Sequence, residues 1–240
     1  MFMRTCWVLD HPAHVRLLAP FLRAGQSNDV IIATRRPEVE GLLDHGDGNL
    51  PRRQTHWVNR PVGPSKRRLA LSRWRSSHSF LRQCNAEGSQ PIERIVVVGA
   101  SIELLAWRSA FLRRCLHSIT QRWYISDTEP NHVAHRLALK SATHFVLPTH
   151  WDDAIDDGLL AKASHAVIHR LDGLHGHVHL RPSIRPTTVS DPPRIVVRRL
   201  LGNGIHDSGE LIAVPNEVLD GLAITDADED AFEGDPWSLM

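Results

Sequence analysis

Residues 5–25, TCWVLDHPAHVRLLAPFLRAG, decide the fold, because an apolar strand here turns into a helix through Asp10, His11, Pro12 and His14. Pro12 suits the first turn of a helix, where its missing N–H costs nothing, and an apolar stripe at helical spacing follows from Val15. In a parallel α/β sheet, ligands bind beyond the carboxyl ends of the strands. This segment is therefore either a binding site or a structural turn, in which Asp10 caps the helix and the histidines are solvated.

Strand-like and helix-like segments alternate along the chain, which predicts a parallel sheet covered by helices on both faces. The expected strands are Cys6–Leu9, Asp29–Thr34, Thr55–Val58, Arg94–Val98, Trp123–Ser126, His144–Leu147, Ala166–His169 and Arg194–Arg198. The expected helices are Val15–Arg23, Pro37–Asp44, Lys66–Cys84, Ile102–Phe111, His132–Lys140 and Trp151–Leu160. The predicted fold class is α/β, a Rossmann-like doubly wound parallel sheet with an incomplete second domain.

The domain boundaries follow from composition. Residues 1–180 are predicted to form the Rossmann-like domain, and the proline-rich residues 181–193 a linker. Residues 194–225 hold one good strand and are too short for a second doubly wound domain. The acidic residues 226–240 are expected to be a disordered tail.

The 240-residue chain has no apolar run long enough to cross a membrane and no secretory signal. Cys6, Cys84 and Cys115 are odd in number and lack CxxC spacing, which disfavours a disulfide framework or a zinc site. A cytoplasmic location is therefore expected.

The net charge of +1 conceals a strong asymmetry. Arg52 to Arg82 contains nine Lys and Arg residues and no acid, whereas Asp226 to Asp235 contains six acids and no base. The basic block indicates a polyanion, an anionic membrane surface or a phosphorylated ligand; the alternative is a solvated helix face. No recognised nucleic-acid-binding module accompanies it, so nucleic acid is not an expected partner.

A second polar segment, ISDTEPNH (residues 125–132), begins at the end of the strand RWYIS (residues 122–126). Asp127 and Glu129 with His132 and His135 can perform acid–base chemistry or bind sugar hydroxyls, although acids before a helix also stabilise its N-terminus. A metal site formed by these residues, or by His175, His177 and His179, is a weaker alternative, because neither spacing is specific. No metal and no cofactor are predicted.

Two further strand ends can contact an anion. Arg35 and Arg36 follow the second strand, where an arginine can clamp a carboxylate or phosphate. Gly99-Ala100-Ser101 lets a ligand approach the backbone, but it has no GxGxxG or GxxxxGK[ST] pattern. No GxSxG elbow supports a nucleophilic serine.

Four landmarks resemble the largely archaeal family known as domain of unknown function 354, which is similar to glycosyltransferase-B enzymes and non-hydrolysing UDP-N-acetylglucosamine 2-epimerases. They are LDHPAHV (9–15), IIATRRPEVEGLLDHG (31–46), SDTEPNHVAHRLALKSATHFVLP (126–148) and DGLHGHVHLRP (172–182). The resemblance, based on the order and spacing of these landmarks, covers roughly residues 4–209.

The resemblance implies two Rossmann-like halves, the first binding an acceptor and the second a nucleotide sugar. It implies cleft positions at His14, Arg35, Asp127 and Glu129. We predict His14, Asp127 and Glu129 as catalytic, and Asp10, His11, Arg35, Ser101, His132 and Arg136 as substrate-binding. A histidine or carboxylate would activate an acceptor hydroxyl.

The chain also departs from the family pattern. The lysine- and glycine-rich loop of the family corresponds here only to RPVGPSKRR (60–68). In the last landmark, residues 172–182, histidines stand where the family has aromatic residues. The second Rossmann-like half is also short. The leading hypothesis is a glycosyltransferase-like protein of cell-surface or lipid-linked glycan assembly, truncated or degenerate, with Arg52–Arg82 against the inner face of an anionic membrane. The alternatives are a non-catalytic acceptor-binding subunit that needs a partner chain, and a sugar-nucleotide 2-epimerase-like enzyme.

Overall fold

The computed structural model describes residues 3–44, 50–61, 64–87, 90–99, 102–108, 114–126, 131–156 and 158–171, together with the strands Arg194–Arg199 and Ala223–Asp228. The chain divides into two compact units, Met1–Leu180 and Arg181–Met240.

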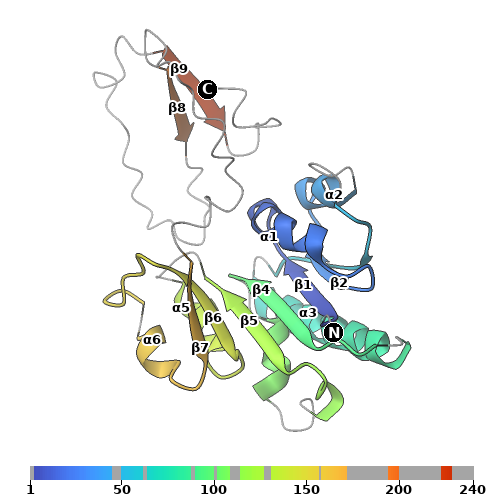
Figure 1. Ribbon diagram of the computed structural model, residues 1–240. Coiled ribbons are helices and arrows are strands. Elements are labelled where there is room, and N and C mark those ends of the chain that lie inside the picture. Colours follow the sequence, from blue (N-terminus) through green and yellow to red (C-terminus); the bar gives the residue numbers. More distant parts are fainter. Residues whose placement is uncertain are drawn as a thin grey trace. The chain divides into compact units, whose positions relative to one another are not determined.

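The first unit is built on a seven-stranded parallel sheet with the order β3-β2-β1-β4-β5-β6-β7 (Figure 1). Its strands are β1 (Thr5–Leu9), β2 (Val30–Thr34), β3 (Gln54–Val58), β4 (Arg94–Val98), β5 (Gln121–Ile125), β6 (His144–Pro148) and β7 (Val167–Leu171). Cys6 pairs with Val30 on one side and Ile95 on the other, so β1 lies at the point where the strand order reverses. The predicted Rossmann-like α/β fold is confirmed.

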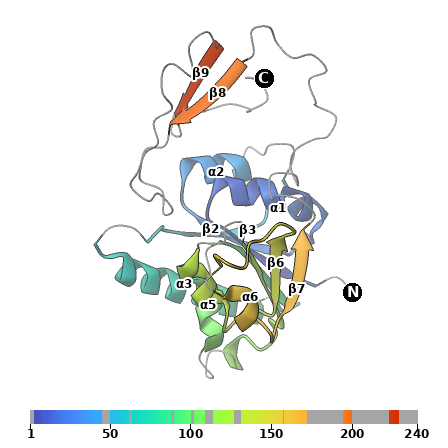
Figure 2. The same cartoon turned by 90° about the vertical axis from the view of Figure 1, so that its left-hand side faces the viewer.

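Helices cover both faces of this sheet, as the alternating sequence predicts. Helices α1 (Pro12–Ala24) and α2 (Pro37–Asp44) lie on one side, and α3 (Lys66–Glu87), α5 (His132–Ala138) and α6 (Leu159–Lys162) lie on the other (Figure 2). A 3₁₀ helix, η1 (Glu103–Arg108), follows β4 and contacts α3.

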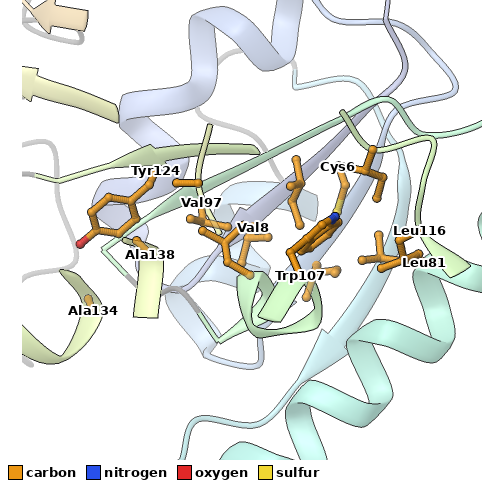
Figure 3. Packing of buried hydrophobic residues seen from close by; sticks show 14 of the residues in the cluster. Cys6, Val8, Leu81, Val97, Trp107, Leu116, Tyr124, Ala134 and Ala138 are labelled. Atoms are coloured by element: carbon orange, nitrogen blue, oxygen red, sulfur yellow. The ribbon is translucent and has the colours of Figure 1, made fainter. Parts of the chain in front are cut away.

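The strands separate two apolar cores, because successive side chains of a strand point to opposite faces. Cys6, Val8 and Val97 face the larger core, which also contains Trp107 and Tyr124 (Figure 3). Trp7, Leu9 and their neighbours face the smaller core, beneath Val15, Leu18 and Leu22 of α1. The two strands β1 and β2 are buried along their whole length, as is expected for the centre of a parallel sheet.

Two helix predictions need correction. A helix over Ile102–Phe111 was expected, but the described part is the 3₁₀ helix Glu103–Arg108. Its first turn has an i→i+3 hydrogen bond from Leu105 N–H to Ile102 O (3.1 Å). The expected helix Trp151–Leu160 is wrong, because the described residues before Leu159 are not helical and α6 begins only at Leu159. The carboxylate of Asp156 explains the late start, since it accepts hydrogen bonds from Leu159 N–H and Trp151 Nε1–H (2.9 and 3.0 Å).

The second unit contains the parallel strands β8 (Arg194–Arg199) and β9 (Ala223–Asp228), paired from Arg194↔Ala223 to Arg199↔Asp228. Strand β9 was not predicted from the sequence. It includes residues 226–228, which were expected to begin the disordered acidic tail and instead pair with β8. The predicted linker, residues 181–193, lies outside the described residues.

Candidate functional site

The polar residues that follow β1 and β4 lie at the reversal of strand order, where adjacent crossovers leave on opposite faces of the sheet. Asp10 to His14 follow β1, and Gly99 directly follows β4. This is the position where open α/β sheets bind their ligands. The sequence prediction for residues 10–14 therefore falls at the expected place in the fold.

A buried ion-pair network anchors the Asp10 side of this site. The Arg73 guanidinium, from α3, donates to Glu103 Oε1 and Oε2 (2.7 and 3.0 Å), to Asp10 Oδ1 (2.8 Å) and to Thr34 Oγ1 (3.3 Å). Thr34 in turn donates to Asp10 Oδ1 (2.6 Å), and Ser77 donates to Glu103 Oε1 (3.2 Å). These contacts join β1, β2, α3 and η1, so they fix the carboxyl ends of two central strands against two helical segments.

The electrostatics of this network favour the charged forms of Asp10 and Arg73. Burial alone would raise the pKa of Asp10, but the Arg73 guanidinium, the Thr34 hydrogen bond and nearby His14 outweigh burial and hold that pKa below its ordinary value. Burial would lower the pKa of Arg73, whereas Glu103 and Asp10 raise it. Arg73 stays charged between two carboxylates.

Asp10 is not the cap of α1, which corrects the structural alternative considered for it. The N-cap is His11, whose Nδ1 accepts a hydrogen bond from Ala13 N–H (3.2 Å). His11 is exposed. Its contact with α1 is structural, and its predicted role in substrate binding stays a prediction.

His14 is oriented by the backbone of the same loop. Its Nδ1 accepts a hydrogen bond from Asp10 N–H (3.3 Å). A neutral imidazole has one donor and one acceptor nitrogen, so this contact assigns the proton of the neutral ring to Nε2. In this tautomer Nε2 carries the proton and lacks the lone pair that a general base requires.

His14 and Asn131 converge beside Gly99. Gly99 adopts a left-handed conformation (φ +61°), which favours glycine. Among the described residues, chain neighbours excepted, the atoms nearest to the position of a Cβ at Gly99 are His14 Nε2 (3.9 Å) and Asn131 Nδ2 (4.0 Å). Two nitrogen-bearing side chains from separate segments therefore border the same point.

His135 was one of the residues considered for metal binding, and the structure places it differently. It is buried, and its Nε2 forms a 2.9 Å hydrogen bond with the Ser126 hydroxyl at the end of β5. Across the part of the chain that the structure describes, no three His, Cys, Asp or Glu side chains are grouped to hold a metal ion. His175, His177 and His179 lie outside that part.

The other predicted site residues are not brought together by the described structure. Arg35 is exposed and lies 4.0 Å from Glu40 in an ion pair, and Arg136 is exposed on α5. His132 begins α5, but its side chain is not described. Ser101, Asp127 and Glu129 lie outside the described residues, so their roles stay predictions.

Sequence reasoning missed Arg73, Glu103 and Asn131. One signal for Arg73 was available: with Ser77, Phe80 and Cys84 it follows the i, i+4, i+7, i+11 spacing of a buried helix face. Glu103 and Asn131 carry no comparable signal, because only the fold brings them near β1.

The cations of the basic block, Arg52–Arg82, differ in their exposure to solvent. Arg73 is buried in the ion-pair network, and Arg53 donates to the carbonyl oxygens of Leu22 and Gln26. The exposed cations of the block are Arg52, Arg60, Lys66, Arg67, Arg68, Arg75 and Arg82. The interpretation as a charged surface therefore holds for these seven residues and is wrong for Arg73.

A surface hollow of about 460 Å³ lies elsewhere, lined by Leu139, Lys140, Lys162 and His165. These residues precede β6 and β7, at the amino edge of the sheet. The hollow is therefore separate from the residues around Gly99. Within the described residues, no helix combines the length and apolar character needed to cross a bilayer.

The chain was compared with protein-family models, curated proteins and solved structures. No family model and no curated protein matches the chain. Among solved structures, the crystal structure of Arabidopsis thaliana UGT89C1 complexed with UDP-L-rhamnose is similar, with a TM-score of 0.47 and 12% sequence identity. The match covers 72% of this chain and 52% of UGT89C1, so the chain spans about half the length of that protein.

Proposed function

We propose that the first unit is the acceptor-binding half of a glycosyltransferase-like protein, as in the family that the sequence resembles. The observation that carries this proposal is the convergence of His14 and Asn131 beside Gly99, at the reversal of strand order. Side chains from two separate segments meet there above a glycine, and the buried Arg73 network holds one flank in place. Such a site can orient the hydroxyls or anionic groups of a sugar acceptor.

The hydrogen bonding of His14 favours binding over proton abstraction. Because Nδ1 accepts the Asp10 N–H, neutral His14 presents a donor at Nε2. On this proposal His14 binds the acceptor, and the predicted Asp127 and Glu129 stay the candidates for the catalytic base. We propose the parallel pair β8–β9 as the beginning of the nucleotide-binding half.

The exposed cations of α3 suggest where the acceptor is presented. Lys66, Arg67, Arg68, Arg75 and Arg82 are exposed along this helix, and Leu71 between them is 45% exposed. A basic helix with an exposed apolar residue suits an anionic membrane surface, where each cation contributes about 1 kcal/mol. We propose that this surface positions the protein against the membrane that carries a lipid-linked acceptor. Sedimentation with phosphatidylserine vesicles, in low and high salt, tests this contact.

A binding screen tests the main proposal. The full chain is applied to an array of glycans, glycolipids and polyprenyl-linked sugars, together with the variants His14→Phe and His117→Phe. We expect a signal on a defined class of acceptor that His14→Phe abolishes and His117→Phe retains, since His117 is an exposed histidine that precedes β5, at the amino edge of the sheet. Absence of any signal from folded protein, or equal signals from both variants, contradicts the proposal.

A second measurement separates the subunit from a complete enzyme. Calorimetric titration with UDP-sugars, followed by an assay for released UDP in the presence of the acceptor, is expected to show no turnover by the chain alone. Turnover would mean that the chain is a self-sufficient transferase and that the subunit interpretation is wrong.

A further inference from the structure

We infer that His144 and His169, which stack against one indole on the last two strands of the sheet, form an acid-sensitive latch that holds β7 in place. At neutral pH both imidazoles are uncharged and β7 stays paired with β6. In mild acid both imidazoles are protonated and β7 separates from β6. This device belongs to the fold of the first unit and does not depend on the proposed function.

Three aromatic rings from neighbouring strands are stacked on this part of the sheet. The indole of Trp123, on β5, has its centroid 4.3 Å from that of His144 and 4.7 Å from that of His169, with interplanar angles of 12° and 19°. The two imidazoles are nearly parallel to each other, at 8°, with centroids 5.5 Å apart. Side chains therefore link β5, β6 and β7, in addition to the pairing of their backbones.

Strand β7 is the strand most sensitive to this stack, because it stands at the edge of the sheet (Figure 1). Among the described residues it pairs only with β6, from His144↔Val167 to Pro148↔Leu171. The side chain of Val167 is 53% exposed, so the amino end of the strand gains little from burial. Elements with few buried contacts open at a lower free-energy cost than a buried central strand such as β1.

The surroundings of the stack disfavour positive charge. Burial, followed by the charges of His169, Arg94 and Arg122, lowers the pKa of His144. None of these groups is a carboxylate, and Arg170, the next charged residue along β7, is also a cation. The Nε2 atom of His169 is buried and forms no hydrogen bond with any described residue, so a proton on this atom has no acceptor there.

The second proton is opposed more strongly than the first. Two imidazolium rings with centroids 5.5 Å apart repel each other, because each carries a full positive charge. An indole attracts a cation to its face, which offsets part of the cost of one proton. However, the guanidinium of Arg94 already lies over Trp123, 5.9 Å from the ring centroid. Separation of β7 from β6 moves the two imidazoles apart and lets water solvate both, so acid favours the open form.

Proton linkage sets the size of the effect. The open form binds the proton of His144 with the ordinary histidine pKa of about 6.5, whereas the closed form binds it less readily. For one such histidine, a fall from pH 7.0 to pH 5.5 raises the opening equilibrium constant by at most about eightfold. Repulsion between the two imidazolium rings adds to this factor, and we expect about tenfold in total.

Hydrogen–deuterium exchange of the full chain tests the latch. Protection of the peptide that contains β7 is measured at pH 7.0 and pH 5.5, corrected for the intrinsic pH dependence of exchange, and compared with the peptide that contains β1. The double variant His144→Phe/His169→Phe keeps aromatic rings in the stack but removes the nitrogens that bind protons. The matched control is His150→Phe, which replaces an exposed histidine that follows β6.

We expect the protection of β7 in the wild type and in His150→Phe to fall about tenfold between the two pH values, and that of β1 to change less than about twofold. In the double variant, the protection of β7 is expected to change less than about twofold as well. The inference is overturned if β7 of the wild type keeps its protection, if β1 loses as much protection as β7, or if the double variant behaves like the control.

A titration of the wild type by NMR gives a readout that does not require the double variant to fold. The ring resonances of His144 and His169 are assigned through the single variants His144→Gln and His169→Gln. We expect protonation of both rings to coincide with the loss of protection in β7. Protonation of either ring without any loss of protection rejects the latch.

Discussion

Replacing Arg73 with methionine is expected to destabilise the first unit more than any exposed substitution on α3. The change removes four hydrogen bonds, two to Glu103 and one each to Asp10 and Thr34. It keeps an apolar stem of similar length in place. The side chain of Glu103 has no exposed surface and that of Asp10 is 15% exposed, so two shielded carboxylates lose the guanidinium that they share.

The cost follows from leaving a charge buried without its partner. Breaking a buried ion pair by removing one member costs about 3–5 kcal/mol. Domains of this size are stable by only about 5–15 kcal/mol in total. The Arg73→Met variant therefore loses a large part of its free energy of unfolding at pH 7.

The deficit should shrink in acid. In the wild type, the pKa of Asp10 is lowered, so its contribution to stability is present above about pH 3.9, the ordinary value, and is lost as the pH falls through the folded pKa. Without Arg73, burial acts on Asp10 unopposed by the guanidinium and raises its pKa, so the folded variant binds a proton that the unfolded chain does not. The difference between variant and wild type therefore decreases as the pH falls from 7 toward 4.

Urea unfolding followed by tryptophan fluorescence measures these differences, provided that the slope of each transition is unchanged. Arg75→Met is the matched control, because Arg75 is an exposed arginine two positions further along the same helix. The control is expected to stay within about 0.5 kcal/mol of the wild type. A loss below about 1 kcal/mol for Arg73→Met, well under the cost of breaking a buried pair, or a loss equal to that of the control, would refute the reasoning.

Two more predictions concern the half of the sheet formed by β5, β6 and β7. Asp156→Ala removes the acceptor for Leu159 N–H, Leu160 N–H and Trp151 Nε1–H and should cost about 1–3 kcal/mol in thermal or urea unfolding, whereas the exposed Asp153→Ala should be nearly neutral. The pKa of His144 is lowered by burial and then by His169, Arg94 and Arg122, so the unfolded chain binds its proton first and stability falls as the pH drops below about 6.5. His144→Phe keeps the stacking on Trp123 and should reduce this pH dependence; an unchanged slope between pH 7 and 5 contradicts the assignment.

The amino-acid sequence determined the architecture of the first unit. Short apolar strands and amphipathic helices are local patterns, and their alternation implies a parallel sheet because parallel strands need crossover connections. It also placed the loop after β1 correctly, since a polar Asp-His-Pro-x-His segment between an apolar strand and a helix can be recognised within a few residues. Strand β9 could not be recognised in this way, because its six residues include acids and pair only with the distant β8.

Only the tertiary structure decided which residues meet at the site. Asp10 and Arg73 are 63 positions apart. Helical spacing can place Arg73 on a buried face of α3, but it does not identify the two carboxylates that Arg73 contacts. Asn131 reaches Gly99 because the strand order brings α5 to the carboxyl ends of β4 and β5. Periodicity fixes which face of an element is buried, whereas the partner of a buried charge is fixed by the packing of distant segments, which no local pattern records.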